Sequence, residues 1–331
     1  MSGQSKREEV DTCRTDACLR LFADEVSAGL SSTTKRLPCK YLYDEEGSRL
    51  FKEIMELREY YPTGCETEIL ERHKADIAAA LDSKAFNVVE LGAGDGTKTK
   101  ILLRHFLDAG LLFHYVPIDI SESALEGLKE DLKREFDGMA VQGLATEYFE
   151  GLRWLSRSMR RMNLVLFLGS NIGNFAPSES RAFLSSLWNA SNDGDLVLIG
   201  FDLKKDLGTI LRAYNDDSGV TARFNINILR RINDELGGDF DLAGFEYYST
   251  YNPRSGAMES FLISRRRQTV YIDLCGRAFS FAKWEPIHTE SSYKFDKGQL
   301  SGLAPENGFE EVANFYDPRR YFTDALWRVR K

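Results

Sequence analysis

The chain lacks the features that mark nucleic-acid-binding and membrane proteins. It has a formal net charge of -8 over 331 residues, and its one dense basic run, 265–267, lies between two strand-like segments. A protein that binds nucleic acid usually presents a basic face, so we expect no such partner and interpret the run as a solvated turn. No apolar run approaches the ~20 residues that span a bilayer, so we expect no membrane association.

Cysteine and histidine are scarce. The cysteines are odd in number and unevenly spread, and no pair has the spacing of zinc ligands: Cys13, Cys18, Cys39, Cys65 and Cys275. The four histidines show neither HxxH nor HExxH spacing, so we expect no metal site. Free thiols are typical of a reducing compartment, and no apolar signal-peptide segment follows the start. These absences predict a cytoplasmic protein.

The middle of the chain alternates apolar runs with helical stretches. The runs are NVVEL, YVPID, NLVLFLG (163–169) and DLVLIGFD (195–202), and each is continuously apolar like a buried parallel strand. Alternation of strands with helices predicts a doubly wound α/β sheet. A helical unit precedes this region, and we expect Pro62 to end it.

The pattern changes after residue 206. A helical stretch is followed by β-type runs that look antiparallel, with turns at 253–256 and 265–267. This change predicts a second, α+β lobe inserted into the first. We expect the two domains to divide the chain as follows: 61–205 and 292–331 in the first, 12–60 and 206–291 in the second.

The most informative motif is GAGDG, residues 92–96, between a strand-like and a helix-like run. Gly92, Gly94 and Gly96 let the backbone approach a ligand with no Cβ in the way. The helix that follows offers free N–H groups and the positive end of its dipole. A nucleoside-type cofactor fits this arrangement. The alternative is a tight turn that needs glycine only for packing.

Asp119 ends the second apolar run, in HYVPIDIS. A carboxylate at the end of the second strand is placed to bind ribose hydroxyls. The alternative is a helix N-cap, because ISES follows. Glu147 and Tyr148 lie where a third strand would end, and they can face an adenine.

Two further motifs suggest a substrate site. FLGSNIGNF opens a polar glycine loop after the fourth strand, and Asn174 offers both donors and an acceptor to an amino acid's ammonium or carboxylate. The alternative is a loop rich in turn formers. In EYYP, Tyr60 and Tyr61 precede Pro62, and a tyrosine ring can attract a methylated ammonium. The alternative is a pair of core aromatics, which we prefer for Tyr61.

Together these motifs resemble one family, the histidine-specific, S-adenosylmethionine-dependent Nα-methyltransferases that form hercynine in ergothioneine biosynthesis. The resemblance runs from about residue 37 to residue 327 and rests on seven segments in order: YLYDEEGSRLFKEIMELREYYPTGCETEIL, VELGAGDGTKTKILL, YVPIDIS, FLGSNIGNF, GFDLKKD, AYNDDSGVTARFNINIL and HTESSYKF. It implies a Rossmann-like class I methyltransferase sheet with an inserted α+β substrate-binding lobe, and S-adenosyl-L-methionine as cofactor.

The resemblance also implies roles for residues. The positions that match cofactor-binding ones are Gly92, Gly94, Lys98, Asp119, Glu147 and Tyr148, with Lys98 near the cofactor's carboxylate. The positions that match those holding the substrate's amino and carboxylate groups are Tyr60, Gly169, Asn174 and Tyr214, of which Tyr60 and Asn174 would aim the amine. Glu290 and Ser292 match the pair that grips the imidazole ring, and Tyr43 matches a further tyrosine of the pocket.

One position departs from the family. In AMESFLIS the fourth residue is usually Met beside the imidazole, and here it is Ser260. A serine would leave the pocket wider and more polar. From the resemblance we expect trimethylation of L-histidine by a monomeric enzyme, and Ser260 favours the alternative, Nα-methylation of another amino acid or related amine. A non-catalytic binding module is disfavoured by the retained pocket residues, and a nucleic-acid methyltransferase by the acidic balance.

Overall fold

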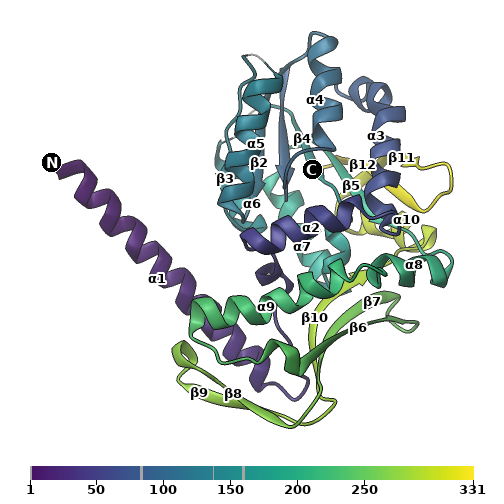
Figure 1. Ribbon diagram of the computed structural model, residues 1–331. Coiled ribbons are helices and arrows are strands. Elements are labelled where there is room, and N and C mark those ends of the chain that lie inside the picture. Colours follow the sequence, from purple (N-terminus) through teal and green to yellow (C-terminus); the bar gives the residue numbers. More distant parts are fainter. Residues whose placement is uncertain (1, 83–84, 137, 159–160) are drawn as a thin grey trace. The chain divides into compact units, whose positions relative to one another are not determined.

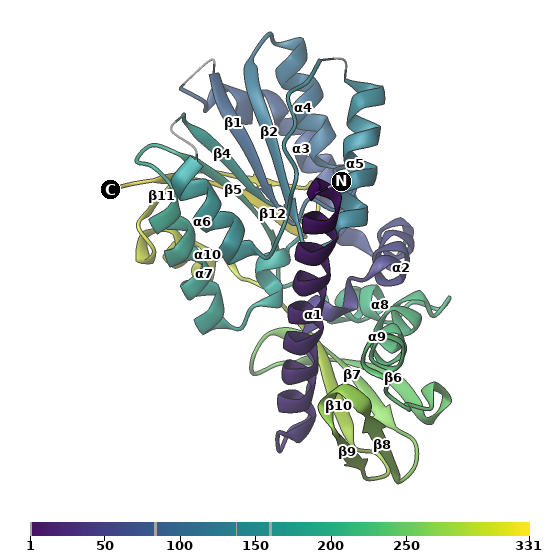
Figure 2. The same cartoon turned by 90° about the vertical axis from the view of Figure 1, so that its left-hand side faces the viewer.

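The structure is a computed structural model that describes residues 2–82, 85–136, 138–158 and 161–331. Figures 1 and 2 show its helices and strands in two views. The chain forms two compact units, and each is described separately. Unit 1 comprises Met1–Phe51, Asn215–Thr250 and Glu259–Glu290. Unit 2 comprises Lys52–Tyr214, Tyr251–Met258 and Ser291–Lys331.

Unit 2 contains a seven-stranded sheet in the order β11-β12-β5-β4-β1-β2-β3. Its strands are β1 (Ala85–Leu91), β2 (Leu112–Asp119), β3 (Leu144–Ala145), β4 (Asn163–Phe167), β5 (Leu196–Asp202), β11 (Phe309–Tyr316) and β12 (Phe322–Val329). The first five are parallel, and the β11–β12 hairpin adds antiparallel to β5. The predicted doubly wound sheet is confirmed. The order of the strands across the sheet reverses between β1 and β4. In open sheets of this kind, ligands bind at the carboxyl ends of the strands at such a point.

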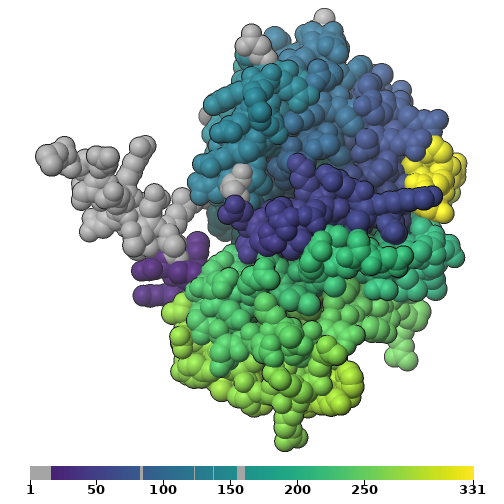
Figure 3. Space-filling view, in the orientation of Figure 1, coloured from purple at the N-terminus to yellow at the C-terminus, as the bar shows by residue number. Residues whose placement is uncertain are grey.

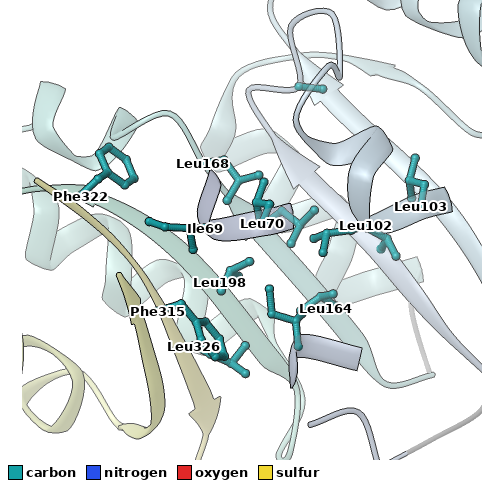
Figure 4. Close-up of a cluster of buried hydrophobic side chains, with 14 of the residues drawn as sticks. Ile69, Leu70, Leu102, Leu103, Leu164, Leu168, Leu198, Phe315, Phe322 and Leu326 are labelled. Carbon is teal, nitrogen blue, oxygen red and sulfur yellow. The ribbon is translucent and has the colours of Figure 1, made fainter. Parts of the chain in front are cut away.

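Side chains of the central strands alternate between two cores because successive strand residues point to opposite faces. In β4, Leu164 and Leu166 join one buried cluster, and Val165 and Phe167 join the other. Figure 4 shows the first cluster, in which Leu70 and Leu102 from the helices point toward Leu164 of the sheet. Burial on both faces explains why these strands read as unbroken apolar runs.

Helices cover both faces of this sheet (Figure 1). They are α3 (Tyr61–Ala79), α4 (Thr99–Asp108), α5 (Glu122–Glu135), α6 (Tyr148–Ser158), α7 (Pro177–Ala190) and α10 (Lys297–Glu306). Helix α8 (Leu207–Tyr214) follows β5 in the same unit. The role predicted for Pro62 is wrong: it lies in the first turn of α3 and so begins a helix. Its missing N–H is not needed there, because the first N–H groups of a helix have no intrahelical partner.

The remaining elements include the β-type runs predicted after residue 206. They are α1 (Ser2–Ser31), α2 (Glu45–Glu56), α9 (Val220–Leu236), β6 (Phe245–Asn252), β7 (Ala257–Ser264), β8 (Gln268–Ile272), β9 (Arg277–Phe281) and β10 (Pro286–Tyr293). Figure 3 shows the outer side of α9, in green, at the surface. The strands form a β10-β7-β6 sheet and a separate β8-β9 sheet. The expected turn at 265–267 therefore links two sheets, and β9 was not predicted.

Chemical features of the described residues bear on the absences noted above. The thiols described, those of Cys18, Cys39, Cys65 and Cys275, are all free. Within residues 2–82, 85–136, 138–158 and 161–331, no cluster of histidine, cysteine, aspartate and glutamate could hold a metal ion. In the same part of the chain, no helix is both long and apolar enough to cross a bilayer.

Candidate active site

The glycine turn follows β1 directly and leads into α4 (Figure 1). Gly92, Gly94 and Gly96 all have positive φ, at 76°, 53° and 64°. A Cβ on Gly92 would lie 2.8 Å from Tyr148 Oη and 2.9 Å from Asn171 Nδ2. A Cβ on Gly94 would meet no described heavy atom within 4 Å, so the backbone there faces open space. The open space at Gly94 fits a ligand that approaches the main chain closely, whereas Gly92 is needed for the packing of Tyr148 and Asn171.

Asp119 ends β2 and ties the turn to this strand. Its Oδ2 accepts a hydrogen bond from the Gly94 N–H at 2.8 Å, and its Oδ1 accepts one from the Ser121 N–H at 2.9 Å. The N-cap of α5 is Ser121, whose side chain accepts from Ala124, so Asp119 is not the cap. Burial raises the pKa of Asp119, although these backbone donors oppose the shift. Each oxygen keeps a lone pair for a ribose hydroxyl.

Glu147 and Tyr148 follow β3 at the same edge of the sheet. The Thr146 N–H donates to the Asp119 carbonyl at 2.8 Å and holds this segment beside the carboxylate. The Tyr148 ring packs edge-on against Phe167, with centroids 5.3 Å apart. A glycine cradle, a strand-end carboxylate and an aromatic wall at one edge fit an adenosine cofactor such as S-adenosylmethionine.

Lys98 has a partner that the sequence did not reveal. Its ammonium forms an ion pair with Glu66 of α3, whose side chain is fully buried. The same carboxylate accepts hydrogen bonds from the Gly169 N–H at 2.8 and 3.0 Å. Glu66 therefore joins two predicted positions, Lys98 and Gly169, that belong to different segments.

The polar loop after β4 forms a short 3-10 helix, Asn171–Asn174. Ser170 has a positive φ of 57°, and its Oγ accepts the Asp202 N–H at 3.1 Å. Among the described residues the Asn174 amide has no hydrogen-bond partner, so its donors and its acceptor are open to a ligand. An open amide at this position is compatible with the predicted contact to an amino acid's ammonium or carboxylate.

Three predicted substrate residues of unit 2 lie together although they are far apart in sequence. The Tyr60 ring meets the Tyr214 ring edge-on, with centroids 6.4 Å apart. The Tyr214 hydroxyl donates to Ser292 Oγ at 2.7 Å. Tyr60 precedes α3 as its N-cap residue and is half-buried. Tyr61, preferred as a core residue, is buried.

A buried charge cluster adjoins these residues. Asp202, at the end of β5, pairs with Lys294 Nζ at 2.8 Å and with Lys205, and Tyr61 Oη donates to its two oxygens at 2.9 and 2.8 Å. Burial alone would raise the pKa of Asp202, but the two ammonium groups hold it below its usual value. Burial lowers the pKa of Lys205 to about 8, and Asp202 opposes that shift.

The other predicted residues belong to unit 1. Tyr43 meets the rings of Phe51 and Phe224 edge-on, at 5.5 Å in each case. Ser260, only 2% exposed, lies 3.2 Å from Tyr247 Oη through its Oγ. This hydrogen bond satisfies the polar group that replaces the usual Met. Glu290 lies in β10, two residues before Ser292.

Sequence reasoning missed Glu66, Asp202 and Lys294, although each left a signal. Glu66 falls at helical spacing with the buried Ile69 and Leu70, so it lies on the apolar face of α3. Asp202 ends a buried parallel strand, as Asp119 does. Lys294 lies two residues after Ser292, and alternation places it on the same face of an extended chain.

Comparison with known proteins gives a consistent result. Residues 22–329 match the family described as "Histidine-specific methyltransferase, SAM-dependent". The chain is 38% identical over 311 residues to the histidine N-alpha-methyltransferase of Mycolicibacterium smegmatis. This alignment covers 94% of this chain and 96% of that protein. The chain is 39% identical over 271 residues to the enzyme of the same name from Mycobacterium tuberculosis, covering 82% and 83%. Identity to the ergothioneine biosynthesis protein 1 of Neurospora crassa is 31% over 304 residues, covering 89% of this chain and 33% of that protein.

Proposed function

Because the chain belongs to the family of histidine-specific, S-adenosylmethionine-dependent methyltransferases, we propose that it methylates the α-amino nitrogen of L-histidine. The product is hercynine, formed by three transfers, and the pathway is ergothioneine biosynthesis. The cofactor supplies an electrophilic methyl group on a sulfonium. The observation that carries the proposal is the cluster of Tyr60, Tyr214 and Ser292 within the unit that holds the glycine turn.

In this proposal the cofactor is bound mainly by the main chain of the glycine turn and by the Asp119 carboxylate. Gly94 leaves room for the ligand at the turn, Gly92 lets Tyr148 and Asn171 lie against the main chain, and Asp119 accepts from the ribose hydroxyls. Glu147 and Tyr148 bound the adenine side. Lys98, already paired with Glu66, is assigned to the cofactor's carboxylate. All of these cofactor residues belong to unit 2.

The substrate side positions a nucleophile. The α-amine attacks as the free base, and orientation alone can be worth about 7–11 kcal/mol of the barrier. Tyr60 and Asn174 aim the nitrogen, and Gly169, Asn174 and Tyr214 hold the amino acid's polar groups. The Tyr60 ring faces the growing trimethylammonium. Glu290 accepts the imidazole N–H, Ser292 binds the other ring nitrogen, and Tyr43 and Ser260 complete the substrate residues.

Product analysis tests this function directly. The protein is incubated with S-adenosylmethionine and an equimolar panel of amino acids, and products are identified by mass spectrometry with fragmentation. We expect histidine methylated on the α-nitrogen, ending at the trimethylated form. The alternative, Nα-methylation of another amino acid or related amine, is favoured by Ser260 and its bond to Tyr247, which make that position small and polar. Methylation of a different amino acid in preference to histidine would support it.

The proposal also covers assembly and compartment. We propose a monomer that acts in the cytoplasm on a small-molecule substrate. The four free thiols among the described cysteines support a reducing compartment. Sedimentation analysis of the full chain at several concentrations tests the assembly state, and a concentration-dependent mass would contradict it.

A further inference from the structure

Lys294 is a fully buried lysine whose ammonium has no capacity left for a ligand. An ammonium has three N–H donors and no acceptor. Lys294 Nζ lies 2.8 Å from Asp202 Oδ2, 2.7 Å from Tyr214 Oη and 2.8 Å from Ser292 Oγ. Its side chain is 0% exposed. All three donors are used, and two of them go to hydroxyls that the proposed function assigns to the substrate.

This arrangement determines which way Ser292 can bond. A serine hydroxyl has one hydrogen and two acceptor lone pairs. Ser292 Oγ accepts from Lys294 and also from the Tyr214 hydroxyl at 2.7 Å, so both lone pairs are filled. Its own hydrogen is the only bonding capacity that remains. Toward any further partner Ser292 acts as a donor.

We propose that Lys294 is a positioning residue that selects the neutral imidazole of the substrate by making Ser292 a donor only. A neutral imidazole has one N–H and one acceptor nitrogen, whereas an imidazolium has two N–H groups. The acceptor nitrogen pairs with the Ser292 hydroxyl, and the N–H pairs with Glu290. An imidazolium would place an N–H donor opposite the Ser292 O–H, which is also a donor, so no hydrogen bond could form between them. This inference rests on the proposed function, because it assigns the imidazole to Ser292.

The inference predicts a pH-dependent affinity. An imidazole titrates near pH 6.5, so about a tenth of it is neutral near pH 5.5. If only that form binds, the dissociation constant of histidine should be about tenfold higher near pH 5.5 than near pH 7.5. Binding is measured by calorimetry with S-adenosylhomocysteine present, so that no methyl transfer occurs.

One group on the strand of Ser292 titrates close to this window, because burial lowers the pKa of His288 from its usual value. The variants below all keep His288, so the comparison between them carries the test. Asp202 stays charged because the two lysines lower its pKa, and Lys205, with a pKa of about 8, stays mostly protonated. Burial raises the pKa of Tyr61 well above its usual value. The other ionisable groups that face the cluster or line a cavity beside it include Tyr60, Tyr214, Cys65, Tyr321, Arg181 and Glu306, with His288 and Glu290 on the same strand.

Lys205 provides a matched control. Both lysines pair with Asp202, and neither side chain is more than 4% exposed, but Lys205 contacts Tyr61 and not the Tyr214–Ser292 pair. Each of the substitutions Lys294→Met and Lys205→Met therefore removes one positive charge that pairs with the Asp202 carboxylate. We expect Lys294→Met to bind histidine more weakly near pH 7.5 and to lose most of the tenfold pH dependence. Lys205→Met should keep it.

The outcomes separate this inference from the proposed function. A wild-type protein that neither binds nor methylates histidine contradicts the proposed function itself. A wild type that methylates histidine but binds it equally at both pH values overturns only the role of Lys294, as does equal loss of pH dependence in both variants. If Lys294→Met does not fold, Ser292→Ala serves instead. It should flatten the pH dependence, and a wild-type pH profile in that variant overturns the inference.

Discussion

At the glycine turn of unit 2 the main chain forms the site, whereas around Asp202 buried side-chain charges form it. The turn uses three positive-φ glycines and N–H groups bonded to Asp119. The Asp202 cluster uses one carboxylate and two ammonium groups, all nearly inaccessible to solvent. A change at the turn should therefore act mainly on cofactor affinity, and a change in the cluster mainly on folding stability. Substitutions in the two regions test that contrast.

The largest effect is expected for Asp202→Asn. The substitution leaves Lys205 and Lys294 buried without their counter-charge, and breaking a buried pair in this way typically costs about 3–5 kcal/mol. The free energy of unfolding, measured by urea denaturation, should fall by that order. The control is Asp217→Asn, which removes the same charge from an exposed site and should change stability by less than about 0.5 kcal/mol. Equal stability of the two variants would show that the cluster is not coupled to folding.

Glu90 sharpens the contrast because it is as buried as Asp202 but has hydroxyl partners. Thr99 Oγ1 lies 2.5 Å from Glu90 Oε1, and the Tyr115 hydroxyl bonds the other oxygen. Burial raises the pKa of Glu90 to about 7, against these hydrogen bonds.

The folded state therefore binds the Glu90 proton more tightly than the unfolded state, and stability is lost as pH rises from about 4.5 through about 7. The loss is at most about 3 kcal/mol. Glu90→Gln should flatten the pH dependence of the unfolding free energy over this range. If the Glu90→Gln variant showed the same pH dependence as the wild type, a group other than Glu90 would be responsible for it.

Gly92→Ala tests the turn itself. A Cβ at this position would displace the Tyr148 and Asn171 side chains, and positive φ adds strain of about 1–2 kcal/mol. Affinity for S-adenosylhomocysteine should fall by about tenfold or more, corresponding to ~1.4 kcal/mol. Gly110→Ala is the matched control, because φ is 67° there and a Cβ would meet no described atom within 4 Å. If both variants lost affinity, the loss at Gly92 would be explained by backbone strain alone and not by the displaced side chains.

The contrast also explains what the sequence could reveal. The turn and Asp119 were predicted, because glycines and a carboxylate between continuous apolar runs have few structural explanations. The Asp202 cluster was not predicted, since its members come from α3, β5, the segment after β5 and the segment after β10, and only folding joins them. The separate β8-β9 sheet was missed for a related reason: strand periodicity indicates strands, not which strands pair. The roles assigned to the candidate cofactor and substrate residues all stay predictions.

The smallest effect is expected for Tyr60→Phe. The ring and its edge-on contact with Tyr214 remain, but the hydroxyl that orients the amine is lost. The turnover rate should fall by several-fold, with the thermal midpoint little changed, since one hydrogen bond is worth ~0.5–1.5 kcal/mol. Tyr60→Ala should in addition weaken product binding, because a cation over an aromatic face contributes ~0.5–2 kcal/mol. An unchanged rate in the Phe variant would make Tyr60 a core residue.

The most direct test of the account measures two affinities in two variants. Asp119→Ala should weaken S-adenosylhomocysteine binding by ~1.5–3 kcal/mol, the value of a hydrogen bond to a charged group. Glu290→Ala should leave that affinity intact and weaken histidine binding, measured with S-adenosylhomocysteine saturating, by ~1–3 kcal/mol. If calorimetry shows that each variant loses only its own ligand, the result supports cofactor binding at Asp119 and imidazole binding at Glu290. Wild-type cofactor affinity in Asp119→Ala, together with wild-type histidine affinity in Glu290→Ala, would contradict it.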